Sequence, residues 1–117
     1  MTRLGDYTPL HIAAKGAHAG VVRLLAESGA DVHARVSSGG ATALHFAAEA
    51  GASEVIRVLV EAGAEVDAIE SAWLQTPLMF AAAGGRTDVV RTLLAAGADP
   101  ARTAWVMDMA AREQEDR

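Results

Sequence analysis

The sequence predicts an all-α solenoid of stacked helix-turn-helix units with projecting β-hairpin loops. The main observation is a seven-residue segment that occurs three times, each copy 34 residues after the last: Thr8–Ala14 (TPLHIAA), Thr42–Ala48 (TALHFAA) and Thr76–Ala82 (TPLMFAA). A second marker keeps the same step: Gly29-Ala30-Asp31, Gly63-Ala64-Glu65 and Gly97-Ala98-Asp99. Two markers in register at a period within about 20–50 residues indicate a stacked array of structural repeats.

Each unit opens with a signal for the start of a helix. Thr8, Thr42 and Thr76 can cap a helix through the hydroxyl oxygen. Pro9 and Pro77 follow at the first helical position, where the missing N–H has no cost. A short first helix should follow in each unit, with paired alanines that let neighbouring helices approach closely.

Glycines should end these first helices, at Gly16, at Gly51 and at Gly84-Gly85. Glycine supplies the left-handed residue that commonly follows a helix. Ala17 stands where the other two units have Gly51 and Gly85. If that position requires a positive φ, Ala17 is strained by about 1 kcal/mol.

A second helix should begin near Ala19, Ser53 and Thr87, with Ser53 and Thr87 as the expected caps. Its apolar residues recur at i, i+1 and i+4, which makes one buried stripe. The stripe comprises Val21, Val22 and Leu25, then Val55, Ile56 and Leu59, then Val89, Val90 and Leu93. Arg23, Arg57 and Arg91 lie on the opposite, solvent-facing side, and the helix should end at Gly29, Gly63 and Gly97.

The segments after these glycines carry turn-forming and polar residues. His33 to Ala41 and Asp67 to Gln75 are predicted to be projecting hairpins, and Ser37-Ser38-Gly39-Gly40 is the expected turn of the first one. Each unit is therefore a helix, a tight turn, a second helix and a protruding loop.

This pattern resembles the ankyrin repeat, whose signature is T-P-L-H-x-A-A, then a V-V-x-L-L helix, then G-A-D-V. Residues 8–14, Val21-Val22-Arg23-Leu24-Leu25 and Gly29-Ala30-Asp31-Val32 match it in order. The resemblance implies one ankyrin domain over residues 1–117, with repeats at about 5–38, 39–72 and 73–104. A capping half-repeat is expected at 105–117, because Met107–Ala111 echoes Leu10–Ala14 before a polar tail.

Two expectations concern the ends of the array. Trp105 is expected to pack the shortened last loop onto the third unit. The first unit has no comparable polar cap, so Tyr7, Leu10 and its alanines should be partly bare and invite weak self-association. The chain enters its first repeat almost at once, which suggests a segment of a longer protein.

Composition excludes several classes of function. The net charge of -5 disfavours binding to nucleic acid, whose phosphates would be repelled. There is no cysteine, which excludes disulfides and thiolate metal sites. No apolar run approaches the ~20 residues that cross a bilayer, and no signal peptide is visible, so a soluble, cytoplasmic protein is favoured. The content of alanine and arginine is compatible with a bacterial source.

His11 and His45 are the tempting catalytic residues, one in each of two units. The ankyrin resemblance implies instead that this histidine bonds nearby backbone, and that Met79 loses those bonds in the third unit. Asp31, Glu65 and Asp99 recur once per unit, which indicates a role in the scaffold, bonding backbone where each loop begins. Catalytic carboxylates would converge as a pair. No phosphate-binding glycine motif and no set of metal ligands is visible, so neither an enzymatic activity nor a cofactor or metal is expected.

Ankyrin proteins generally meet a partner with their loop tips and the exposed side of their first helices, which form a concave surface. Carried over by position, this surface would comprise Tyr7, Lys15, Ser38, Ala41, Glu49, Trp73, Gln75 and Arg86. Trp73 would be either a binding anchor or a side chain folded against the neighbouring loop. The leading hypothesis is a non-catalytic module that binds a protein. The alternative is a structural spacer of a longer array.

Overall fold

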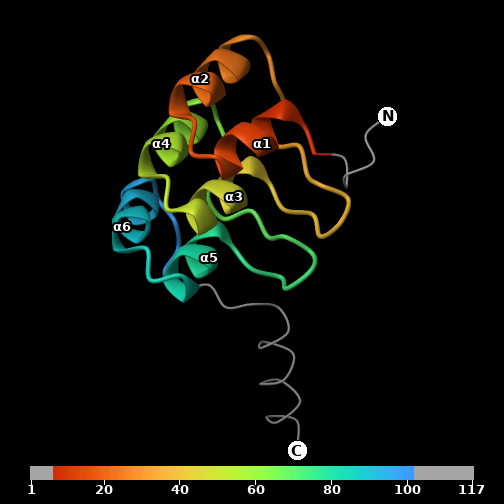
Figure 1. Cartoon of the computed structure of the whole chain (residues 1–117). Coiled ribbons are helices and arrows are strands. Elements are labelled where there is room, and N and C mark those ends of the chain that lie inside the picture. Colours follow the sequence, from red (N-terminus) through yellow and green to blue (C-terminus); the bar gives the residue numbers. More distant parts are fainter. Residues whose placement is uncertain (1–6, 102–117) are drawn as a thin grey trace, which may run out of the picture.

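The computed structural model describes residues 7–101, and these form six α-helices without a β-strand. The helices form three pairs: α1 (Pro9–Lys15) with α2 (Ala19–Glu27), α3 (Ala43–Ala50) with α4 (Ser53–Glu61), and α5 (Pro77–Ala83) with α6 (Thr87–Ala95). Helices α1, α3 and α5 stack in one row, and α2, α4 and α6 stack in a second row beside it (Figure 1). The predicted all-α repeat fold is confirmed.

Two loops project from the side of the first row of helices (Figure 1). We call residues 31–42 finger 1 and residues 65–76 finger 2. A backbone hydrogen bond crosses each finger at the same place, from Val36 N to Ala41 O and from Glu70 N to Gln75 O, both at 3.0 Å. Finger 1 has a second one, from Gly40 N to Val36 O at 2.8 Å. These bonds close turns and do not form a strand ladder, so the described residues do not show the strands of the predicted β-hairpins.

The first helices begin as the sequence predicts, at a threonine. Thr8 caps α1 by accepting from His11 N at 3.3 Å, and Thr76 caps α5 by accepting from Met79 N at the same distance. The second helices also begin at the expected residues, but the predicted caps are wrong. Ser53 and Thr87 are the first helical residues, and Ala52 and Arg86 precede them without any capping side chain.

The reason is the tight turn inside each pair. Ala52 N donates to Ala47 O at 3.0 Å, and Arg86 N donates to Ala81 O at 2.9 Å. These bonds to the end of the first helix place Ala52 and Arg86 at the start of the second helix, so Ser53 and Thr87 fall inside the helix.

The core lies between the two rows and between successive pairs. Small residues fill the first row, where Ala14, Ala47, Ala48 and Ala81 are fully buried. Larger aliphatic residues of the predicted stripe fill the second row: Val22, Val55, Ile56, Leu59, Val89 and Leu93. The small alanines bring the first helices close together, as the sequence predicts.

Two predictions about the first unit are wrong. Leu10, Ala13 and Ala14 are buried rather than partly bare. Val21, expected in the buried stripe, is half exposed. Val21 is equivalent to Val55, and Val55 is covered by the unit before it. The described residues contain no unit before the first, so Val21 is left uncovered.

The bare apolar face of the first unit therefore comprises Ile12, Val21 and Leu24. Their equivalents in the second unit, Phe46, Val55 and Val58, are all buried. The half-repeat cap predicted for residues 105–117, including Trp105, lies outside the described residues.

The position after each first helix has the left-handed backbone that the sequence analysis suggested. Gly51 and Gly85 have φ values of 76° and 68°, and Ala17 has a φ of 63°. An L-residue with a side chain is disfavoured there because its Cβ approaches the following carbonyl oxygen. Ala17 is therefore strained where the other two units are relaxed.

We predict that Ala17→Gly raises the free energy of unfolding by about 1 kcal/mol, because glycine removes the Cβ clash at positive φ. Urea denaturation monitored by circular dichroism measures the change. Ala62→Gly is the matched control, since Ala62 is also exposed after a helix but has a φ of -84°. Stabilisation by Ala62→Gly, or destabilisation by Ala17→Gly, would contradict the strain at Ala17.

Candidate functional site

Two buried histidines attach the fingers to the first row of helices. The Nδ1 atom of His11 accepts from Thr8 N at 3.0 Å, so its Nε2 carries the proton and donates to Ala34 O at 2.8 Å. His45 repeats the arrangement, because its Nδ1 accepts from Thr42 N at 3.1 Å and its Nε2 donates to Gln75 O at 2.9 Å. Each ring thus joins a helix start to backbone of the finger that follows.

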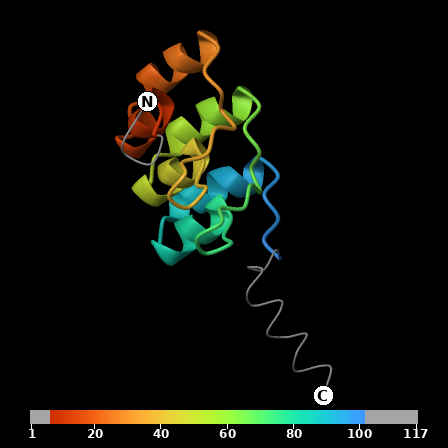
Figure 2. The same cartoon turned by 90° about the vertical axis from the view of Figure 1, so that its right-hand side faces the viewer.

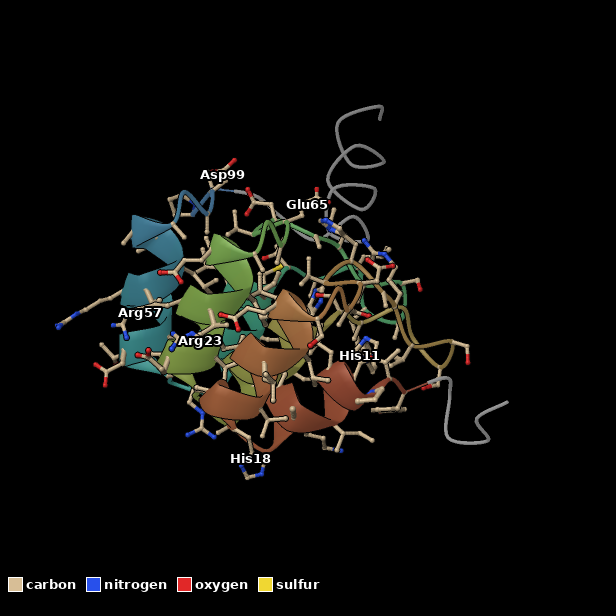
Figure 3. All side chains as sticks on the ribbon, turned by 90° about the horizontal axis from the view of Figure 1, so that it is seen from above. His11, His18, Arg23, Arg57, Glu65 and Asp99 are labelled. Carbon is tan, nitrogen blue, oxygen red and sulfur yellow. The ribbon has the colours of Figure 1, made fainter. Side chains whose placement is uncertain are left out.

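Neither ring is accessible to a substrate, since His11 and His45 are 1% and 0% exposed. The structural role expected for them is confirmed in their hydrogen bonds. In the third unit Met79 donates only its backbone N–H to Thr76, and its side chain cannot supply the second bond. Figure 3 shows His18 pointing into solvent, away from His11.

The two fingers are bonded to each other as well. Gly39 O accepts from Ser71 N at 2.7 Å, from Ala72 N at 3.1 Å and from Ser71 Oγ at 3.0 Å. Arg35 lies between the fingers and donates through Nη1 to Gly40 O at 2.8 Å and to Ile69 O at 2.7 Å. Fingers 1 and 2 lie side by side in both ribbon views (Figures 1 and 2) and form one continuous surface.

Glu70 is a functional candidate that the sequence analysis missed. Its side chain is 1% exposed, and its carboxylate accepts from Trp73 N at 3.0 Å and from Gln75 N at 3.2 Å. Glu70 occupies the position of Val36 in finger 1, which is also buried. An acidic residue at an apolar position of the repeat was the signal that could have identified it.

Trp73 lies at the tip of finger 2 with 71% of its surface exposed. It is therefore not folded against finger 1, which was the alternative. Leu74 follows with a φ of 57°, a left-handed conformation that leucine rarely adopts. The backbone of this tip is fixed by Glu70, while the indole extends into solvent.

Three other residues of the predicted surface, Tyr7, Lys15 and Arg86, lie away from the fingertips. Tyr7 and Lys15 lie together at the first unit, where the Tyr7 ring is 5.4 Å from the Phe46 ring and Lys15 Nζ is 6.0 Å from the Tyr7 ring. Arg86 is in the α5–α6 turn, and its side chain lies over Gly51 of the preceding unit.

The other members of the predicted surface differ in exposure. Ser38 at the tip of finger 1 and Glu49 on α3 are exposed. Ala41 and Gln75 are half-buried, and their carbonyl oxygens accept hydrogen bonds within the fingers and from His45. Ser38, Ala41, Trp73 and Gln75 therefore belong to one bonded unit formed by the two fingers.

The recurring acidic residues form part of the scaffold. Asp31 Oδ1 accepts from His33 N, and Asp99 Oδ1 accepts from Ala101 N, both at 2.9 Å. Glu65 makes no such bond within residues 7–101, so the expectation fails there. Asp67 instead accepts from Asp99 N at 3.2 Å. Figure 3 shows Glu65 and Asp99 along the same edge of the molecule.

The outer row of helices carries ion pairs between units. Glu54 lies 3.0 Å from Arg57 on the same helix and 3.8 Å from Arg23 on the preceding unit. All three side chains are more than half exposed, so these pairs contribute at most about 1 kcal/mol each. Figure 3 shows both arginines on this outer side, away from the fingers.

Residues 7–101 show neither a metal site nor a membrane-spanning helix. That part of the chain contains no group of three or more His, Asp or Glu side chains placed to hold a metal ion. The helices described there are also too short and too polar to cross a bilayer.

The comparisons with known proteins agree with this geometry. A family model described as Ankyrin repeats (3 copies) matches residues 2–70 and 39–104. The chain therefore belongs to the ankyrin repeat family. Ankyrin repeats are generally protein–protein interaction modules, and the family is typically non-catalytic. The search among curated proteins found no match.

The buried state of His45 makes stability depend on pH. Burial lowers the pKa of His45 below its ordinary value of 6.5, and this outweighs the Gln75 carbonyl and the Glu70 carboxylate, which raise the pKa. As the pH falls below 6.5, His45 takes up a proton in the unfolded chain before it does so in the folded chain. The stability linked to His45 is therefore fully present above pH 6.5 and is lost as the pH falls through the lower pKa of the folded state.

We predict that His45→Gln reduces the loss of unfolding free energy between about pH 7.5 and about pH 5.5. Urea titrations of both chains across this range measure the loss. His33→Gln, which changes an exposed histidine of finger 1, is the control, and the loss should persist there because His45 is retained. An unchanged loss in His45→Gln would contradict this source of the pH dependence.

Proposed function

We propose that this chain is a non-catalytic recognition module that binds a protein partner through the fingers and the exposed side of the first helices. The observation that carries the proposal is Trp73, a large aromatic side chain that is mostly exposed at a hydrogen-bonded fingertip. Tryptophan is among the residues that dominate binding energy at protein interfaces. The predicted surface of Tyr7, Lys15, Ser38, Ala41, Glu49, Trp73, Gln75 and Arg86 supplies the contacts around this anchor.

The rigidity of the platform supports the proposal. His11 and His45 attach the fingers to the helices, and Gly39 and Arg35 join the fingers to each other. A surface that is already ordered loses little conformational entropy on binding, so more of the contact energy becomes affinity.

A catalytic function is disfavoured by the same geometry. His11 and His45 are the residues best suited to proton transfer, and both are buried in bonds to backbone. A substrate would have to displace these bonds to reach either ring. We therefore assign the histidines to stability and the fingers to recognition.

The alternative function, a spacer within a longer array, is favoured by a different observation. Ile12, Val21 and Leu24 are exposed at positions that the second unit buries against its neighbour. Ala41, Ala50, Ala83 and Gly84 also offer little side chain to a partner on the concave side. As a spacer the chain would bind nothing through Trp73, and the bare face would give at most the weak self-association predicted from the sequence.

We predict that Trp73→Ala reduces capture of the partner by tenfold or more, because a buried tryptophan anchor contributes at least about 2 kcal/mol at an interface. Pull-down with quantitative mass spectrometry on immobilised wild-type and variant chains measures the capture. Leu24→Ala is the matched control, because Leu24 is an exposed large apolar residue on the outer row.

Capture that survives Leu24→Ala and is lost in Trp73→Ala supports recognition by the fingers. Equal capture by all three chains, or loss only in Leu24→Ala, would contradict it and favour the spacer. Circular dichroism of each variant confirms that the fold is retained.

A further inference from the structure

Fingers 1 and 2 share one crossing bond, but different bonds hold their tips. The crossing bond is the same in both, from Val36 N to Ala41 O and from Glu70 N to Gln75 O. The tips differ, because finger 1 places Gly39 and Gly40 where finger 2 places Trp73 and Leu74. Gly40 has a φ of 73°, and Leu74 has a φ of 57° at the equivalent position.

This difference places strain in finger 2 alone. Glycine adopts the left-handed region without a steric cost, whereas leucine brings its Cβ against the carbonyl oxygen. Finger 2 therefore carries side chains on its tip at the expense of an unfavourable backbone conformation. An additional interaction is needed to hold that conformation. In finger 1 the backbone alone holds the tip, because Gly40 N donates to Val36 O at 2.8 Å.

Glu70 supplies this interaction. Both carboxylate oxygens of Glu70 lie 3.0 Å from Trp73 N, and Oε1 lies 3.2 Å from Gln75 N, so the bonds flank Leu74 on each side. Hydrogen bonds to an ionised group are stronger than neutral ones. A valine would suffice to fill this buried position, as Val36 does in finger 1. The carboxylate is therefore required by the tip that it holds.

The chemistry of the joined tips limits the kind of partner. The exposed residues Ser37, Ser38, Ser71, Ala72 and Trp73 carry no charge. An indole has an apolar face and one N–H donor, so it fits a neutral apolar pocket with an acceptor at its wall. A strongly basic segment would find no complementary charge on these residues, and the exposed guanidinium of Arg35 between the fingers would repel it.

We infer that Glu70 is a positioning residue that preforms the second fingertip, so that Trp73 is a ready anchor for an uncharged apolar pocket on a folded protein. This inference rests on the proposed function, since it specifies the site and the class of partner. Glu70 acts through the backbone of the tip and need not touch the partner itself.

Amide hydrogen exchange by NMR tests the positioning role without any partner. In Glu70→Val the amides of Trp73 and Gln75 should exchange at least tenfold faster, while the amides of α4 keep their rates. Glu70→Gln retains one acceptor oxygen and should show a smaller acceleration than Glu70→Val. Rates at Trp73 and Gln75 that do not change in Glu70→Val, or that change no more than those of α4, would overturn the inference.

A triple variant covers the case in which Glu70→Val alone folds poorly. Glu70→Val combined with Trp73→Gly and Leu74→Gly gives finger 2 the residues that finger 1 has at these three positions. Glycine at both positions removes the need for the carboxylate, so at least half of the fall in melting temperature should be recovered. A triple variant that melts no higher than Glu70→Val would contradict the link between Glu70 and the left-handed leucine.

The class of partner is tested with β-cyclodextrin, which offers a neutral apolar cavity. Its addition should shift the NMR signal of the Trp73 indole N–H, and Trp73→Ala should abolish this response. The absence of any shift would contradict an anchor that is free to enter such a pocket. Binding to phosphatidylglycerol vesicles through Trp73 would overturn the assignment of a protein partner in favour of a lipid surface.

The experiments separate the recognition role of Trp73 from the positioning role of Glu70. If Trp73→Ala leaves partner capture unchanged while the Glu70 variants loosen the tip, the proposed function fails and the mechanical role of Glu70 survives. If Trp73→Ala abolishes capture while Glu70→Val leaves the tip protected, recognition survives and the inference about Glu70 fails.

Discussion

The structure depends on two buried histidines. His11 joins the start of α1 to finger 1, and His45 joins the start of α3 to finger 2. The Nδ1 atom of His45 accepts from Thr42 N, which leaves Nε2 with the proton that it donates to Gln75 O. Helix and finger are thus held by the two sides of one ring, and the same holds for His11. Without these bonds the fingers would be held to the helices chiefly by buried apolar residues such as Val32 and Val36.

Attachment to the helices gives the tip of finger 2 a fixed orientation. Gln75 links the two buried groups of finger 2, because its carbonyl accepts from His45 and its N–H donates to Glu70. The orientation of Trp73 therefore follows from the helix row through a short series of bonds. The side chains of His45 and Glu70 are buried, and low local polarity strengthens the hydrogen bonds of buried groups.

Much of this architecture could be predicted because the repeat imposes it locally. The Thr-Pro start, the glycine ends and the apolar stripe are properties of short segments, and the helices begin where these signals stand. The predicted strain at Ala17 is also local, since two other copies of the unit show glycine at that position.

The predictions that failed depended on neighbours in space. Ser53 was a reasonable cap by residue type, but the preceding helix brings Ala52 N to a carbonyl and leaves the hydroxyl no role. Val21 matched the buried stripe, yet its burial needs a preceding unit to cover it. Glu70 was missed because a carboxylate in a loop is ordinarily exposed, and the equivalent Val36 was the one sign in the sequence that this position is buried. The predicted partner-binding residues likewise stay predictions until a partner is in hand.

If the bonds of His45 and Glu70 hold finger 2 in place, finger 2 and the helices move as one rigid body. The chain lacks cysteine, so spin labels can be placed at two introduced cysteines alone, Ala72→Cys at the fingertip and Thr87→Cys at the start of α6. Double electron–electron resonance would compare this pair with a reference pair on helices, Lys15→Cys and Thr87→Cys. We expect the two labelled pairs to give distance distributions of equal width. A clearly broader distribution for the fingertip pair would contradict it.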